Sequence, residues 1–351
     1  MDFKSEFFNL IEKANSIVIT SHTSPDDDSI GSILSVFQII KQKYPQKKLR
    51  AVQTGEKIDR YNYFENYQSV EFVLDMADSL GDADLLIFLD GLKQSRFSKN
   101  PDKLSKFTGK TVCIDHHSSS PDNFDLSLID ALSMSTCGLI YRLFNKDIEI
   151  TKPLAESLFL GILGDSGNYG FIRPSDIEIF DISKDLVTKG QINIQEFQSK
   201  YNFISERIFA LFQELIKNTQ FVQIENWPKF NYSFIEREYL EKEKFSDSEA
   251  NIASALYVGD FPTMGNFVRT VKDYSWGFTL TLKQNGSCSI SLRSLPSSVN
   301  VRLLMEQMQI GGGHDRAAGG TFLSNGQAIL QPNECLEKLF KWMKENQPVL
   351  S

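Results

Sequence analysis

The sequence feature that most constrains this chain is the stretch Ile17–Ser32, which reads IVITSHTSPDDDSIGS. An apolar, β-branched run ends at His22, three consecutive aspartates follow at positions 26–28, and an amphipathic helical pattern then begins. In open α/β sheets, ligands bind at this junction between a strand and the next helix. A single aspartate could serve only as a helix N-cap, but three adjacent carboxylates repel one another unless a positive charge lies among them. We therefore expect a divalent cation at this junction.

Two later apolar runs end in the same kinds of residue. Residues 85–89 lead into Asp90, and residues 111–114 lead into Asp115, His116 and His117. Continuous apolar runs are typical of strands buried on both faces of a parallel sheet. Because the C-terminal ends of parallel strands lie along one edge of the sheet, we expect these acids and histidines to converge there.

The positions of the histidines support this interpretation. The four histidines of the chain are His22, His116, His117 and His314. A histidine taken alone is more often structural than a ligand, but three of these follow predicted strands beside aspartate and the fourth lies in a glycine cluster. Oxygen ligands with a minority of imidazole and no thiolate suit Mn²⁺ or Mg²⁺. Shared carboxylates predict two ions about 4 Å apart, and a water between them would lose a proton near neutral pH and attack phosphorus in line.

Composition limits which binding partners and which cellular compartment we expect. The net charge of −8 argues against binding to long duplex DNA, whereas small phosphorylated substrates remain compatible because metal ions supply positive charge locally. The four cysteines form no C-x-x-C pair, which favours buried thiols in a reducing cytoplasm. No stretch has the pattern of a signal peptide or a membrane span. We therefore expect a cytoplasmic protein.

The order of predicted elements indicates two domains, as the length of 351 residues also suggests. Strands and helices alternate over residues 1–200, which predicts an α/β domain with a mostly parallel sheet flanked by helices, although residues 55–80 predict no single element. An amphipathic helix within residues 201–219 is expected to link this domain to a smaller α+β domain over residues 220–351, with the active site in the cleft between them. In the smaller domain we predict strands at Phe221–Ile224, Tyr232–Ile235, Asn266–Val271, Trp276–Leu282 and Cys288–Leu292. We predict helices there at Val299–Met308 and Cys335–Glu345.

Taken together, these motifs resemble a known family. The pattern His22-x-x-Pro25-Asp26-x-Asp28-x-x-Gly31-Ser32, followed by Asp90, Asp115-His116-His117 and Asp165, resembles the four motifs of the DHH phosphoesterase superfamily. The segment Ser291–Ser294, with Gly311-Gly312-Gly313-His314 and Ala317–Gly320, resembles the DHH-associated C-terminal domain. The architecture is most similar to the nanoRNase type, which degrades very short RNAs and removes the 3′-phosphate from adenosine 3′,5′-bisphosphate.

This resemblance implies roles for individual residues. It implies two metal sites, formed by His22 and Asp26 for the first ion, by Asp28, His116 and Asp165 for the second, and by Asp90 bridging both. Asp115 would orient a neighbouring ligand. His117 would face the scissile phosphate, as a hydrogen-bond donor or a proton source for the leaving oxygen.

In the second domain the resemblance implies a phosphate-binding site. Arg293 would clamp a terminal phosphate beside Ser291 and Ser294. The glycines Gly311, Gly312 and Gly313 would let backbone amides approach the same phosphate, and His314 would contact it. The sequence departs from the family where Ile310 replaces a glycine and where Asp165-Ser166-Gly167 replaces Asp-Thr-Gly. We interpret Asp27 as a helix-start acid and Arg96 as a member of a surface ion pair.

The expected function is a Mn²⁺-dependent phosphohydrolase, with Mg²⁺ as the other candidate metal. Its substrates would be short oligoribonucleotides, including linear dinucleotides such as pApA, and adenosine 3′,5′-bisphosphate. A cyclic-dinucleotide phosphodiesterase and a RecJ-like single-strand exonuclease would share the same ligand residues, whereas a pyrophosphatase would carry a different C-terminal signature. A nucleotide-binding protein without activity is disfavoured because no ligand is missing. A homodimer is left open.

Overall fold

The chain forms two compact units, Met1–Asn202 and Phe203–Ser351. The computed structural model describes residues 2–23, 25–118, 120–201, 203, 205–247, 249–250, 271–323 and 331–350. No helix in these ranges is long and apolar enough to cross a membrane.

The first unit is built on a six-stranded sheet in the order β3-β2-β1-β4-β5-β6. Every neighbouring pair of strands is parallel, so the predicted parallel sheet is confirmed. The chain builds outward from β1 to one edge, returns to β4 and then builds to the other edge, which creates a topological switch point beside β1. The strands are β1 (Ser16–Ser21), β2 (Lys48–Thr54), β3 (Val70–Val73), β4 (Leu85–Leu89), β5 (Lys110–Asp115) and β6 (Leu126–Ile129).

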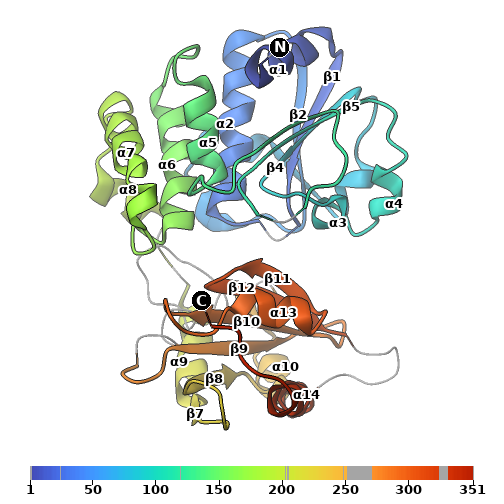
Figure 1. Cartoon of the computed structure of the whole chain (residues 1–351). Coiled ribbons are helices and arrows are strands. Elements are labelled where there is room, and N and C mark those ends of the chain that lie inside the picture. Colours follow the sequence, from blue (N-terminus) through green and yellow to red (C-terminus); the bar gives the residue numbers. More distant parts are fainter. Residues whose placement is uncertain are drawn as a thin grey trace. The chain divides into compact units, whose positions relative to one another are not determined.

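Helices cover both faces of this sheet, as Figure 1 shows. Alternate residues of β1 point to opposite faces: Ile17 and Ile19 join the core under α2, α5 and α6, whereas Val18 joins the core under α3 and α4. This burial on both faces explains why β4 is wholly apolar and why the centre of β1, residues 17–19, is apolar. The helices are α1 (Phe3–Lys13), α2 (Asp27–Lys43), α3 (Gln94–Phe97), α4 (Pro101–Leu104), α5 (Thr136–Phe144), α6 (Lys152–Ser166), α7 (Glu178–Lys189) and α8 (Ile194–Tyr201), with 3₁₀ turns η1 (Asp59–Tyr61), η2 (Tyr67–Ser69), η3 (Met76–Asp78) and η4 (Pro174–Asp176).

The start of α2 and the end of α6 are set by local signals. Asp26 is the N-cap of α2 and forms a capping box with Ser29. Gly167 ends α6 in the left-handed conformation. The two helices approach closely at Gly31, where a β-carbon would be 2.5 Å from the carbonyl oxygen of Ser157. This close packing brings the C-terminal end of α6 beside the N-terminal turn of α2.

The second unit is a smaller six-stranded sheet in the order β11-β12-β10-β9-β8-β7, in which only β8 and β9 are parallel. Its core contains Trp276, Phe278 and Phe230. Of the predicted strand Asn266–Val271, residues 266–270 lie outside the described residues. The elements are α9 (Glu206–Lys217), β7 (Gln220–Val222), β8 (Phe230–Phe234), α10 (Arg237–Lys242), β9 (Trp276–Leu282), β10 (Cys288–Ser294), α13 (Val301–Gln307), β11 (Gly311–His314), β12 (Ala317–Phe322) and α14 (Pro332–Glu345).

The helix expected as a linker packs into the second unit. Leu211, Phe212 and Leu215 of α9 are buried in the core of that unit. Because this apolar face needs a core to cover it, residues 206–217 belong to the second unit rather than standing between the two units.

Candidate metal centre

The strand ends of the first unit place the predicted ligands along one edge of the sheet. His22 follows β1, Asp90 follows β4, and His116 follows β5. Asp90 has a left-handed backbone (φ 59°), and its amide donates to the carbonyl of Ile114 on the neighbouring strand. Asp90 is therefore turned sharply at the end of its strand.

One group of side chains consists of His22, Asp26 and Asp90. His22 Nε2 lies 3.6 Å from Asp26 Oδ2 and 3.4 Å from Asp90 Oδ2. The loop is held from β2, because Gln53 donates to the carbonyl oxygen of His22 at 2.7 Å and accepts from the Ser21 hydroxyl at 2.8 Å. The three ligand atoms lie close enough together to hold one metal ion.

A second group consists of Asp28, His116 and Asp165. His116 Nε2 lies 3.0 Å from Asp165 Oδ2 and 3.9 Å from Asp28 Oδ2. It also lies 3.6 Å from Asp90 Oδ1. Asp90 therefore faces the first group with one carboxylate oxygen and the second group with the other.

These separations match those between donor atoms that share a metal ion. Donor atoms about 2.1 Å from an octahedral ion lie about 3.0 Å apart when adjacent and about 4.2 Å apart when opposite. The distances from His22 Nε2 and His116 Nε2 to their carboxylate neighbours, 3.0 to 3.9 Å, fall in this range. The donor set of carboxylates and imidazoles also suits a divalent cation.

The N-terminal turn of α5 orients Asp28. The amides of Thr136 and Cys137 donate to Asp28 at 2.7 and 2.9 Å, and the Thr136 hydroxyl donates to Asp90 Oδ1 at 3.1 Å. Free amides at a helix start are suited to bind a carboxylate. Sequence reasoning missed both residues, although Ser135, the N-cap of α5, marked the helix start.

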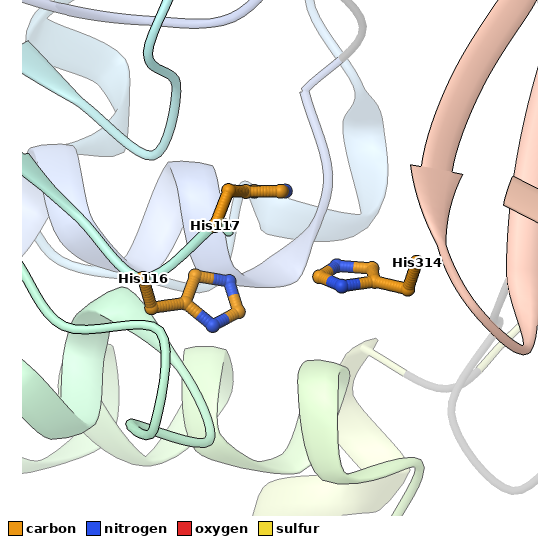
Figure 2. Close-up of side chains that lie close together, drawn as sticks. All are labelled: His116, His117 and His314. Carbon is orange, nitrogen blue, oxygen red and sulfur yellow. The ribbon is translucent and has the colours of Figure 1, made fainter. Parts of the chain in front are cut away.

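Asp115 organises the two histidines that follow it. Its Oδ1 accepts from the amides of His116 and His117 at 2.6 and 2.9 Å and lies 2.7 Å from His117 Nδ1. His116 Nδ1 lies 3.2 Å from the carbonyl oxygen of Ser133. Figure 2 shows the two imidazoles close together on the loop after β5, with ring centroids 4.7 Å apart. These contacts fit an orienting role for Asp115.

The carboxylates of the site repel one another when no cation lies between them. Burial, together with the neighbouring carboxylates, raises the pKa of Asp28 and of Asp165 well above the usual value. Burial also acts to raise the pKa of Asp90, but the neighbouring imidazoles of His22, His117 and His116 lower it below the usual value. The site thus concentrates more negative charge than its histidines balance, and divalent cations would relieve this repulsion.

In the second unit, the predicted phosphate-binding residues are brought to neighbouring strands. Arg293 on β10 and His314 on β11 both pair with Ala317 on β12, so they occupy one row of the sheet. Arg293 is buried, and its Nη1 donates to the carbonyl oxygen of Leu292 at 2.9 Å and to the Ser291 hydroxyl at 3.4 Å. Ser294 is also buried. Figure 2 shows His314 extending from β11.

Packing explains two of the three glycines in β11. A β-carbon on Gly311 would be 1.9 Å from the carbonyl oxygen of Gly319, and Gly313 has a φ of +139°. Packing against β12 therefore requires both glycines. At Gly312 the nearest atoms, in the side chain of Glu306, lie 4.0 Å away. Of these three positions, only position 312 has no packing contact that requires glycine.

Asp27 lies in the first turn of α2, directly after the N-cap Asp26, as expected of a helix-start acid, and its carboxylate also accepts hydrogen bonds from Arg60 and Tyr61. The interpretation of Arg96 needs correction. Arg96 is exposed and makes no ion pair with the described residues, and its carbonyl oxygen instead accepts from the amide of Thr23. The six predicted ligands, by contrast, do come together.

Residues 16–162 match the DHH family, N-terminal domain. This match lies within the first unit and confirms the resemblance to the DHH phosphoesterase superfamily that the motifs indicated.

Proteins of known name resemble the chain over most of its length. The bifunctional oligoribonuclease and PAP phosphatase NrnA of Bacillus subtilis is 26% identical over 339 residues, which span 93% of this chain and 95% of the relative. The protein of the same name from Thermus thermophilus is 24% identical over 307 residues, which span 87% and 83%. An exopolyphosphatase-related protein from Bacteroides fragilis has the same fold, with a TM-score of 0.78 at 22% identity, covering 98% of this chain and 96% of that one.

Proposed function

We propose that this chain is a two-metal phosphohydrolase that cleaves short oligoribonucleotides, such as pApA, and removes the 3′-phosphate of adenosine 3′,5′-bisphosphate. The observation that carries the proposal is the position of Asp90, whose two oxygens face His22 and His116 at 3.4 and 3.6 Å. A carboxylate placed in this way is suited to bridge two ions. The likeness to proteins named oligoribonuclease and PAP phosphatase over most of both chains supports the choice of substrates.

The residues that would hold the ions follow from the two groups. His22 and Asp26 would bind one ion, Asp28, His116 and Asp165 the other, and Asp90 both. Mn²⁺ suits this mixture of carboxylate and imidazole, with Mg²⁺ as the alternative. When bound, such ions polarise the phosphoryl oxygens and lower the pKa of a water nucleophile.

His117 is suited to supply a proton to the leaving oxygen. Burial acts to lower its pKa, but the hydrogen bond to Asp115 raises the pKa above the usual value. Because Nδ1 faces Asp115, the proton on Nε2 is left to donate. A protonated imidazole held in this way would act as a general acid.

The second unit would recognise the phosphate end of the substrate. Arg293 and His314 share one row of the sheet and would contact a terminal phosphate, together with Ser291, Ser294 and the amides of residues 311–313. The chain's net charge of −8 favours short substrates over long polymers, because it offers no excess of positive charge for a long backbone. The four buried, free thiols suit a cytoplasmic enzyme.

The test is a comparison of rates with Mn²⁺ for four substrates: pApA, adenosine 3′,5′-bisphosphate, cyclic di-AMP and a long single-stranded oligonucleotide. We expect the first two to be hydrolysed fastest and EDTA to stop both reactions. Preferential cleavage of cyclic di-AMP would indicate a cyclic-dinucleotide phosphodiesterase. Faster degradation of the long strand would indicate an exonuclease instead.

A further inference from the structure

Asp27, the middle residue of the three consecutive aspartates, has a role separate from its neighbours. Asp26 and Asp28 belong to the two groups that could hold metal ions, and Asp27 belongs to neither. Its buried carboxylate accepts from Arg60 Nη2 at 2.7 and 2.9 Å and from the Tyr61 hydroxyl at 2.6 Å. Three hydrogen bonds therefore fix the direction of Asp27.

The donors come from a closely packed part of the fold. Arg60 and Tyr61 lie in η1, within the polar stretch for which the sequence predicted no element. The Tyr61 ring packs against Tyr67 with centroids 5.7 Å apart, and the Arg60 guanidinium lies 4.9 Å from the centre of the Tyr61 ring. The side chain of Arg60 is only 10% exposed. Neither donor can move without disturbing the packing around it.

The opposite side of Asp27 is also confined. A β-carbon on Gly164 would be 2.5 Å from Asp27 Cβ, so α6 presses against this residue immediately before Asp165. Asp27 is thus held between η1 and α6. Since Asp26, the N-cap, and Asp28 flank it at the start of α2, any rotation of this segment would redirect both of their carboxylates.

We propose that Arg60 is a positioning residue for the metal centre: acting through Asp27, and assisted by Tyr61, it sets the directions of Asp26 and Asp28 so that both ions are held. The inference rests on the proposed two-metal function. Arg60 also compensates a buried carboxylate that would otherwise be left unpaired. The segment after β2 that contains η1 then holds the start of α2 in place.

The experiment compares the full chain with Arg60→Met by titration calorimetry with MnCl₂ and by electron paramagnetic resonance of the bound Mn²⁺. We expect Mn²⁺ affinity to fall about tenfold or more, as when other partners that orient metal ligands are removed, and the exchange-coupled signal of paired ions to weaken. Arg60→Lys, which keeps a charged donor, should recover part of the affinity. Arg50→Met is the matched control, because it removes an arginine–glutamate pair of the same unit, Arg50 Nε to Glu71 Oε1 at 2.8 Å, away from the site.

Asp27→Asn provides a second test if Arg60→Met does not fold, since it keeps the side-chain volume and leaves no unpaired carboxylate. Unchanged affinity and coupling in either variant would overturn the inference. A tighter Mn²⁺ complex in Arg60→Met would overturn it too, since Arg60 would then act only as a repelling charge. If the unaltered chain bound no pair of Mn²⁺ ions, the proposed function would fail and this inference with it, whereas a normal pair unaffected by these substitutions would refute the inference alone.

Discussion

Gly161 of α6 and Asp28 of α2 are in such close contact that a β-carbon on Gly161 would be 2.4 Å from Asp28 Oδ1. The same β-carbon would be 2.3 Å from Cys137 Sγ. Glycine is therefore required here for close approach and not for a turn, because the position is inside a helix. Gly161 binds no metal, but it thus fixes the position of Asp28, which could bind one.

Gly161→Ala tests this contact. The added methyl group must push Asp28 away from the second group, so we expect Mn²⁺ affinity to fall about tenfold or more and stability to fall by about 1–3 kcal/mol from overpacking. Calorimetric titration and thermal melting in EDTA measure the two effects. Gly190→Ala is the control, since its β-carbon would be 2.5 Å from Ala155 Cβ, which belongs to neither group; it should lower stability and leave Mn²⁺ affinity unchanged. Equal effects of both substitutions on Mn²⁺ affinity would contradict this explanation.

Asp90→Asn tests the proposed bridging carboxylate. Asn tolerates the left-handed backbone that Asp90 adopts at φ 59°, so the substitution removes the charge while keeping the turn. We expect both Mn²⁺ ions to bind more than about a hundredfold more weakly, because a ligand contributes more than a residue that only orients one, and hydrolysis of pApA to be lost. Asp102→Asn, at an exposed acid in α4, should behave as the unaltered chain. Two ions bound normally by Asp90→Asn would show that another residue bridges them.

Metal affinity should rise with pH because of His22. Burial acts to lower its pKa, but the neighbouring carboxylates of Asp26 and Asp90 raise the pKa to about 9. Mn²⁺ must displace this proton, so its apparent affinity should increase about tenfold per pH unit below pH 9 for one proton released. Calorimetry between pH 6 and 8.5, in buffers with different ionisation enthalpies, counts the protons. A flat affinity over this range would contradict the shift.

The same titration should affect the metal-free protein in the opposite direction. The folded-state pKa of His22 lies above its usual value, so its contribution to stability is full below about pH 6.5 and is lost as the pH rises through about 9. In EDTA we expect the melting temperature to fall over this range. His22→Gln, which lacks this titration, should show less of the fall; an identical pH profile in both proteins would rule out His22 as its source.

Arg293→Lys tests phosphate recognition by the second unit. Lysine keeps the charge but loses the planar fork that contacts two phosphate oxygens together, so we expect the KM for pApA to rise about tenfold, about 1.4 kcal/mol of binding. Hydrolysis of bis-p-nitrophenyl phosphate, which has no terminal phosphate, should be unchanged. Arg207→Lys, at an exposed arginine of α9 paired with Glu249, is the control. An equal loss on both substrates would mean that Arg293 does not act through the terminal phosphate.

The sequence by itself determined the sheet and the identity of the clustered side chains. Apolar runs ending in Asp90 and in Asp115-His116-His117 could be recognised because burial on both faces leaves a continuous hydrophobic pattern. Parallel strands end at one edge, so the convergence of His22, Asp90 and His116 followed from the order of the elements.

The tertiary structure alone decided what holds those side chains in place. Asp28 is bound by amides more than a hundred residues away, at Thr136 and Cys137, and Asp27 is bound by Arg60 in a segment without periodicity. The amphipathic pattern of α9 likewise showed an apolar face but not which core would cover it. Such contacts join distant residues through packing, and packing leaves no repeat in the sequence because each partner is chosen by shape and charge at one point in space.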